Sequence, residues 1–324
     1  MAKLDLKDRK ILYQLDMDCR QLNTQIGKKV GLKKDVVSYR IKKLEDEGFI
    51  KNYYTVIDAY RVGYNLFRYY INFQYVTSEL RKEIIEYFVN YKNICTVAHA
   101  AGKYDLIVVV WVKNLNEFHQ FWTKALDKYG DYFEARVFSV YINGIGFIQS
   151  YLLLDNFKQE DKIELETFGV GDTTEVDEID YHLLNELSLN ARASLIELAK
   201  KFNCSSQTIS YRMDRLKKEG VIQAYRVAID LAKLELKRYK VDIYLKEYKQ
   251  RKNIINYIKK CPYLIYISTS TGISDLEFEF VVESSEKLIE IIEDINTTFP
   301  NSIRSYGFYG DLKIYKETFL PKLF

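Results

Sequence analysis

Hydrophobic and polar positions repeat in the same order along two long stretches of the chain. Residues 4–58 and 176–230 align without a gap at a constant offset of 172. In each stretch, apolar residues at helical spacing predict three short helices, and a glycine ends the third helix. A short β-rich segment follows, at 49–57 and at 221–229, and predicts a two-stranded wing within each copy. The pattern therefore indicates one folded unit that is present twice.

The pattern after each of these units predicts a strand, a helix, two strands, a helix and a last strand. In the first copy, Tyr69, Ile71 and Phe73 alternate as the first strand, and the last strand is expected over 133–142. The second copy repeats this order at an offset of about 170, which places a loss of two residues near residue 63. We expect a ferredoxin-like layer with helices on one face of its sheet. The other face is expected to be covered by the twin layer of the same chain.

These patterns predict an α+β chain in which two winged helix-turn-helix domains alternate with two ferredoxin-like βαββαβ domains. The expected boundaries are 1–60 for the first helix-turn-helix, 64–150 for the first βαββαβ domain, 151–175 for a linker, 176–232 for the second helix-turn-helix and 236–324 for the second βαββαβ domain.

The composition of the chain is that of an ordinary globular protein, with 48% hydrophobic and 29% charged residues. The net charge of +3 is too small to indicate a nucleic-acid partner. Evidence for such a partner must therefore come from the local distribution of charge. The four cysteines lie far apart in sequence, which argues against a disulfide framework or a zinc site. The charged start of the chain, and the lack of any run of about 18 apolar residues, predict a cytoplasmic protein without a membrane span.

The third predicted helix of each copy has a basic outer face. The window 33–43 holds five basic residues and one acid, and the window 200–218 holds six basic residues and one acid. Such a face on one helix is most often only a solvated surface, but the same feature on the helix after the turn in both copies favours DNA. Lys and Arg would neutralise phosphates, and Ser, Gln, Asp and Tyr would reach base edges. The candidate DNA-binding residues are Lys34, Asp35, Ser38, Tyr39, Arg40, Lys42, Lys43, Ser206, Gln207, Ser210, Tyr211, Arg212, Arg215 and Lys217.

The two outer faces differ at equivalent positions. Lys34 and Asp35 of the first copy correspond to Ser206 and Gln207 of the second. Gln bonds adenine in a bidentate way, whereas Lys prefers guanine and Asp accepts from cytosine. A single chain is therefore expected to prefer two unlike half-sites in a fixed order, about one helical turn apart.

Several motifs of the chain resemble those of the Lrp/AsnC (feast/famine) transcriptional regulators. These motifs are Arg20, the run 36–40, Leu44-Glu45, Gly48, Ile50 and the turn Gly102-x-Tyr104-Asp105. The resemblance covers nearly the whole chain twice, apart from the expected linker, and the tandem form is similar to fused regulators seen mainly in archaea. It implies an N-terminal helix-turn-helix and a C-terminal effector domain in each unit.

The resemblance also implies partners. These are double-stranded DNA, a small amino-acid-like effector, and the second unit of the same chain as an intrachain pseudo-dimer, with a further homo-oligomer left open. The implied effector-binding residues are Gly102, Tyr104, Asp105, Gly272 and Asp275. The chain departs from the family pattern at Lys33, where the second copy keeps the helix-capping Ser205, and at Ser274, where the first copy has Tyr104.

The histidines and cysteines form no catalytic or metal-ligating constellation, so we expect no enzyme activity, no cofactor and no metal. Some proteins of similar fold are decarboxylases that act on a tetrapyrrole, with His or Arg in the strand region of His99. Such an enzyme is one alternative to the regulator, although a packing role is the favoured interpretation of His99. The other alternative is a protein-binding scaffold whose heads have lost DNA binding.

Overall fold

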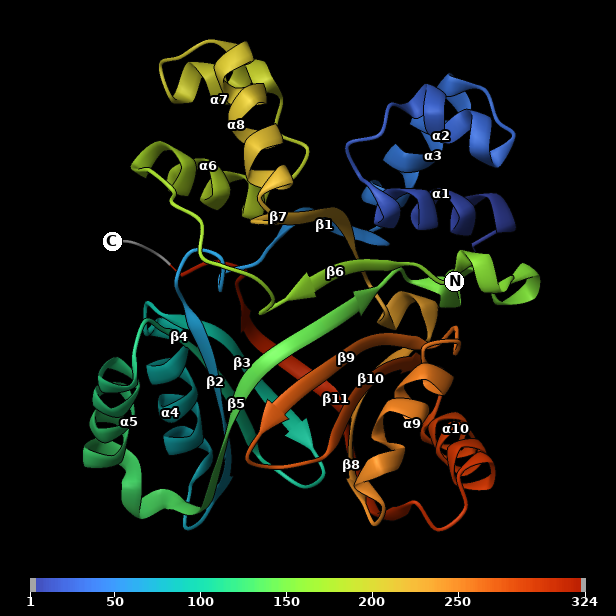
Figure 1. Cartoon of the computed structure of the whole chain (residues 1–324). Helices are drawn as coiled ribbons and strands as arrows, with labels where there is room; N and C mark the ends of the chain where they lie inside the picture. The colour runs from blue at the N-terminus through green and yellow to red at the C-terminus, as the bar shows by residue number, and fades with distance from the viewer. Residues whose placement is uncertain (1–3, 322–324) are drawn as a thin grey trace.

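The computed structural model describes residues 4–321. Figure 1 shows two helical units above a large sheet that carries helices on its outer sides. The helices are α1 (Leu6–Met17), α2 (Asn23–Val30), α3 (Lys34–Asp46), α4 (Ser78–Asn90), α5 (Leu115–Tyr129), α6 (Glu178–Leu189), α7 (Leu195–Lys201), α8 (Ser206–Lys218), α9 (Arg251–Ile258) and α10 (Ser285–Thr298). The strands are β1 (Ile50–Ile57), β2 (Asn65–Phe73), β3 (Ile94–Ala101), β4 (Leu106–Val112), β5 (Phe133–Phe147), β6 (Glu164–Phe168), β7 (Ile222–Ile229), β8 (Lys237–Leu245), β9 (Leu264–Thr271), β10 (Leu276–Val282) and β11 (Ile303–Glu317).

We call α1–α3 head one and α6–α8 head two; β2–β5 with α4 and α5 form half one, and β8–β11 with α9 and α10 form half two. Each head begins with an aspartate whose carboxylate accepts a main-chain amide of the first turn, Asp5 from Asp8 at 2.8 Å and Asp177 from Asp180 at 2.7 Å. The expected α+β class, with winged helix-turn-helix and ferredoxin-like parts, is confirmed.

The wing differs from its prediction, because neither copy forms a β pair of its own. Each copy contributes one unbroken strand, and β1 pairs antiparallel with β7 of the other copy. The sequence 49–57 contains no glycine, and Asn52 is followed by Tyr53, so the segment lacks the Asn-Gly or Asp-Gly pair of a tight hairpin turn. The strand therefore continues and finds its partner in the second copy. Helix α1 packs on β7 and α6 packs on β1, so both heads rest on the β1–β7 pair, which we call the floor.

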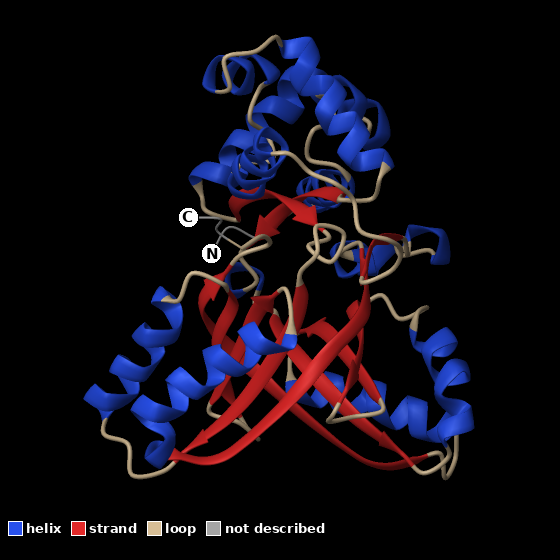
Figure 2. Cartoon of the chain, turned by 60° about the vertical axis from the view of Figure 1, so that its left-hand side comes forward, coloured by secondary structure: helices blue, strands red, loops and turns tan. Residues whose placement is uncertain are grey.

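The main sheet closes on itself. Its order is β2-β4-β3-β11-β8-β10-β9-β5-β6, and β5 also pairs with β2. Within each half the strands follow the ferredoxin-like order, β5-β2-β4-β3 in half one and β11-β8-β10-β9 in half two. Figure 2 shows the helices of the two halves on opposite outer sides of the sheet.

Two long strands join the halves, and both are longer than predicted, since the expected ranges were 133–142 for β5 and about 302–308 for β11. Strand β5 pairs with β2 from Phe133 to Val140 and then with β9 of half two up to Gly146. Strand β11 pairs with β8 up to Tyr309 and then with β3 of half one from Gly310. The predicted strands ended where each one leaves its own half, because the remainder is stabilised only by the other half.

The two-residue loss does not lie near residue 63, where we expected it. Ile71 pairs with Leu106 in half one, and Ile243 pairs with Leu276 in half two. Ile243 is 172 residues after Ile71, whereas Leu276 is 170 residues after Leu106, so the loss falls after β2, on the way to α4. Arg68 therefore corresponds to Lys240.

The segment 151–175, expected to act as a linker, carries β6, which pairs with the end of β5. Glu166 of β6 accepts a hydrogen bond from Arg226 Nη1 of β7 at 2.8 Å, and Arg226 Nε donates to Asp16 of α1 at 2.8 Å. The equivalent of Arg226 is Tyr54, which stacks on Phe319 at 4.7 Å between ring centroids. The two heads thus rest on the sheet through different chemistry.

The interior of the closed sheet is apolar on the side of half one except for buried Arg68 of β2, and it carries several charged side chains on the side of half two. Successive residues of β4 alternate, so that Ile107, Val109 and Trp111 face inward. At the equivalent positions of β10 stand Glu277, Glu279 and Val281. Among residues 4–321, no helix is both long enough and apolar enough to cross a membrane.

Candidate nucleic-acid interface

The third helix of each head stands on the head's core with one apolar face. In α3 this face consists of Val37, Ile41 and Leu44, which are buried. In α8 the equivalent buried residues are Ile209, Met213 and Leu216. The opposite face of each helix is therefore left for solvent or for a partner.

The candidate side chains divide into two groups by exposure. Eight of them are exposed on the outer faces: Lys34, Asp35, Tyr39, Lys42, Lys43, Gln207, Tyr211 and Lys217. The remaining six are half-buried: Ser38, Arg40, Ser206, Ser210, Arg212 and Arg215.

The arginines of the half-buried group are held inside the heads by carboxylates. Arg40 Nη1 donates to Asp5 at 2.8 Å and to Asp8 at 2.7 Å. The bond with Asp8, and next to it the bond with Asp5, raises the pKa of the Arg40 guanidinium. Arg212 Nη1 makes the same contacts in head two, with Asp177 and Asp180, each at 2.7 Å. Arg215 also pairs with Asp180, whose side chain is fully buried.

The start of the third helix differs between the heads. Ser205 Oγ accepts the amide of Thr208 at 3.0 Å at the start of α8, whereas Lys33 provides no side-chain cap for α3. In head one, Asn23 Nδ2 instead donates to Ser38 Oγ at 2.8 Å and so ties α2 to α3. Ser38 is therefore a packing residue as well as a candidate for base contact.

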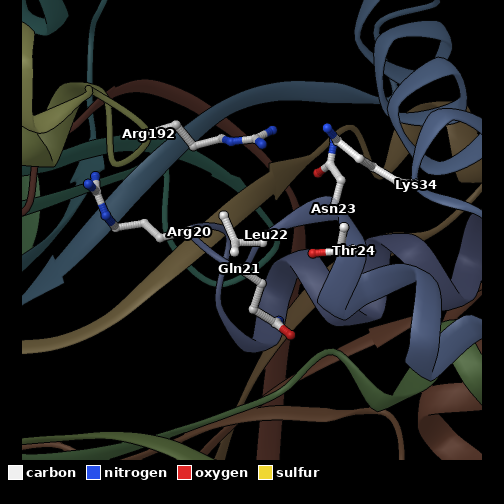
Figure 3. Close-up of a pocket in the computed structure, with 7 residues that line it drawn as sticks. All are labelled: Arg20, Gln21, Leu22, Asn23, Thr24, Lys34 and Arg192. Atoms are coloured by element: carbon white, nitrogen blue, oxygen red, sulfur yellow. The ribbon is translucent and has the colours of Figure 1, made fainter.

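A hollow of about 470 Å³ lies between the heads, lined by Arg20, Gln21, Leu22, Asn23, Thr24, Lys34 and Arg192. We call it the central hollow. Figure 3 shows Arg20 and Arg192 on one side and Asn23 and Lys34 on the other. Our candidate list contained Lys34 but neither Arg20 nor Arg192. Their signal in the sequence was the match of two arginines at equivalent positions of the repeat, outside the third helix.

The residues expected to bind an effector are used for packing in this structure. The Tyr104 ring is buried, 4.5 Å from the ring centroid of Tyr70. Asp105 Oδ2 accepts the amide of Phe73 at 2.9 Å, and Asp275 Oδ2 accepts the amide of Leu245 at 2.7 Å. Both carboxylates therefore fix the turn to the end of the neighbouring strand of their own half.

The two turn glycines lie against the opposite half. Gly102 and Gly272 have φ of +129° and +123°, where other residues are strained. A Cβ on Gly272 would lie 2.7 Å from the Phe138 carbonyl oxygen, and one on Gly102 would lie 3.4 Å from that of Phe308. Glycine at these positions thus allows the turns to approach the long strands β5 and β11.

His99 has a structural contact, because its Nδ1 lies 2.8 Å from the carbonyl oxygen of Asp105. Within residues 4–321, no group of three or more His, Cys, Asp or Glu side chains is arranged to hold a metal ion.

Comparison with known proteins identifies the heads. Residues 4–51 and 176–223 match the family model described as winged helix-turn-helix DNA-binding. The HTH-type transcriptional regulator FL11 of Pyrococcus furiosus is 30% identical over 118 residues, which cover 36% of this chain and 77% of the relative. The regulator LrpA of Pyrococcus horikoshii is 27% identical over 113 residues, which cover 34% of this chain and 77% of the relative.

Among solved structures, the siroheme decarboxylase NirDL is similar over 98% of this chain and 94% of its own, with a TM-score of 0.66 and 12% identity. At this identity the likeness concerns the fold alone. The relatives with higher sequence identity, each matched over about a third of this chain, are named as regulators. The chain therefore belongs to the Lrp/AsnC family of DNA-binding transcription regulators, with two copies of the family's unit in one polypeptide.

Proposed function

We propose that one chain binds duplex DNA through both heads and recognises two unlike half-sites in a fixed order. The observation that supports this most directly is the difference between the exposed first turns of α3 and α8. Lys34 and Asp35 are exposed in head one, and Gln207 is exposed at the position equivalent to Asp35 in head two. Because the heads are joined through β1 and β7, a chain bound to DNA presents both faces at a fixed separation.

The exposed cations support a strong electrostatic contribution to binding. Lys42 and Lys43 lie on the outer face of α3, and Lys217 lies on that of α8. Each phosphate that such a residue neutralises releases counterions, so log affinity falls with log salt by about 0.9 per phosphate.

Selection of DNA fragments by the purified full chain tests the proposal. We expect a consensus of two different half-sites in constant order. Gln207→Ala is expected to relax preference in one half-site only, by about 1–3 kcal/mol for each lost base contact. Asp35→Ala is the matched change in head one and is expected to relax only the other half-site. A palindromic consensus would contradict the proposal, and absence of any selected sequence would favour a scaffold without DNA binding.

We further propose that a small amino-acid-like effector acts at the turn of Gly102. The support is the position of this turn at the junction of the halves, where Lys103 Nζ of half one donates to Tyr244 Oη of half two at 3.1 Å. A ligand there would contact both halves and so alter their packing. Thermal-shift measurements with the common amino acids at millimolar concentration test this, and no shift with any of them would leave the turn a packing element.

A further inference from the structure

The β1–β7 pair, which forms the floor between the heads, carries two tyrosines, and each of them is covered by an arginine of the opposite head. Tyr53 of β1 and Tyr225 of β7 occupy equivalent positions of the repeat. The Arg192 guanidinium of head two lies 4.8 Å from the Tyr53 ring centroid, and that of Arg20 in head one lies 5.5 Å from that of Tyr225. These cation–π contacts hold two positive charges on the β1–β7 pair, one from each head.

Main-chain contacts fix both arginines in this place. The Cys19 amide donates to the Tyr225 carbonyl at 2.9 Å, and the Ala191 amide donates to the Tyr53 carbonyl at 3.0 Å. Arg20 Nη1 in turn reaches across to the carbonyls of Ala191 and Ala193, at 2.5 and 2.9 Å. Arg192 Nη1 donates to Tyr53 Oη at 3.2 Å and its side chain stays partly exposed.

The central hollow adds further donors on the side of head one. Its lining contains three cations, Arg20, Lys34 and Arg192, and no acidic residue. It also contains Asn23 and Thr24 in the first turn of α2, a helix of eight residues. The N-cap residue Leu22 offers no side-chain acceptor to these amides, and its own amide donates to Gln25 Oε1 at 3.0 Å. The amides of a first turn are donors for an anion.

The equivalent wall in head two is different. Leu195, Ile196 and Ser206 stand where head one has Asn23, Thr24 and Lys34. The Ser194 hydroxyl accepts the amide of Glu197 at 3.1 Å at the start of α7. The wall in head one, with the first turn of α2 and Lys34, is thus basic and offers donors to an anion. The equivalent wall in head two is apolar, and the start of α7 is capped by Ser194.

We propose that the central hollow is a third DNA contact, which holds backbone phosphates of the segment between the two half-sites. This inference rests on the proposed function, since DNA held by both third helices must pass over the floor between them. Guanidinium groups bind phosphate oxygens in a bidentate way and carry no base preference there. Because the donors lie toward head one, the contact favours one strand and helps to orient the duplex on the chain.

The test uses the full chain and a duplex that contains its selected site. Arg192→Ala is expected to weaken binding to all duplexes by the same factor and to lower the slope of log affinity against log salt by about 0.9 for each phosphate lost. Arg192→Lys should keep most of the slope. Arg304→Ala is the control, because Arg304 of half two also lies on a tyrosine ring, that of Tyr244, away from the heads.

A second pair of variants does not depend on the packing of Arg192. Thr24→Glu places a carboxylate in the first turn of α2, where it favours the helix but repels phosphate. Ile196→Glu makes the same change at the equivalent position of head two. We expect Thr24→Glu to weaken DNA binding at least tenfold more than Ile196→Glu, with the melting temperature unchanged or raised in both.

A neutral methylphosphonate placed at each central phosphate in turn locates the contact. At one or more positions the methylphosphonate should lower the affinity of the wild-type chain for the duplex and leave the affinity of Arg192→Ala unchanged. Equal effects of Thr24→Glu and Ile196→Glu, or an unchanged salt slope in Arg192→Ala, would overturn the inference. The inference would also be overturned if inorganic phosphate stabilised the wild-type chain and not Arg192→Ala in thermal-shift measurements, while the two proteins bound DNA with the same affinity. A wild-type chain that binds no DNA would instead refute the proposed function.

Discussion

At the level of single residues, two of the arginines on the third helices form ion pairs within their own heads. Arg40 and Arg212 lie on the third helices, but their guanidinium groups connect each of these helices to the start of α1 or α6. Asp180 receives both Arg212 and Arg215 and is fully buried. These arginines therefore position the recognition helix, whereas Lys42, 74% exposed and paired only with Asp46 at 3.3 Å among the ion pairs of the described chain, remains available to DNA.

Arg212→Ala should therefore lower stability more than it alters the salt dependence of DNA binding. The change removes a charged partner from buried Asp180, and we expect a loss of about 1–3 kcal/mol in the free energy of unfolding. Denaturant titration gives this loss, and DNA titrations at several salt concentrations give the slope. Lys42→Ala is the matched control, with stability retained and the slope reduced. A reduced slope at full stability in Arg212→Ala would return Arg212 to the DNA interface.

At the scale of elements, the strand exchange between β1 and β7 determines how the heads are held. Thr55 Oγ1 of β1 donates to the Leu187 carbonyl of α6 at 2.8 Å, so the strand of copy one forms part of the core of head two. The segment with β6 adds a buried connection, from Glu166 through Arg226 to Asp16. We therefore expect these contacts, and not the continuity of the chain, to hold the two copies together.

Cleavage of the chain between the copies should leave the molecule assembled. A protease site inserted after Thr173, an exposed position beyond β6, would divide the chain into two fragments. We expect the fragments to elute together in size-exclusion chromatography and to bind the selected duplex as the intact chain does. The same sample in denaturant should show two separate fragments. Separation without denaturant would mean that the linkage, and not the shared strands and sheet, holds the copies together.

For the whole molecule, the charges inside the closed sheet favour pairing of unlike halves. Arg68 Nη1 of half one lies 2.8 Å from Glu277 Oε2 of half two, and Lys240 contacts the same carboxylate. The position of half one that is equivalent to Glu277 is Ile107. Two copies of half one would therefore bury two Arg68 side chains with no carboxylate at this position, which is costly.

Moving this carboxylate between the halves tests its role. Glu277→Ile leaves Arg68 without its partner and is expected to cost about 3–5 kcal/mol. The double variant Glu277→Ile with Ile107→Glu restores one carboxylate at the equivalent position and should recover a large part of that loss in denaturant titrations. Ile107→Glu alone is the control, with a second carboxylate and no third cation. Equal stability of Glu277→Ile and the double variant would contradict the account.

The Glu277 carboxylate should also contribute to the pH dependence of stability. Burial raises the pKa of Glu277, but Arg68 and Lys240 outweigh it and hold that pKa well below its usual value. A depressed pKa in the folded state means that the contribution is present above the pKa of the unfolded chain, near 4.3, and is lost as the pH falls below it. Glu277→Ile should therefore lose less stability than the wild-type chain between pH 5 and pH 3.

The sequence by itself determined the repeat, the class of fold and the family, because these depend on local periodicity and on motifs that each copy carries alone. It also placed the helices of both heads, since capping residues and apolar stripes act within one element. The pairing of β1 with β7, the full length of β5 and β11, and the site of the two-residue loss were decided only by the tertiary structure. For β1, β5 and β11 the partner that stabilises the strand lies in the other copy, more than a hundred residues away. The site of the two-residue loss follows instead from the register of β2 with β4 in one half and of β8 with β10 in the other. The same holds for the candidate DNA interface. The sequence selected basic residues, but only the folded heads separate arginines bound to carboxylates from lysines open to solvent. Only the pairing of β1 with β7 brings Arg20 and Arg192 together.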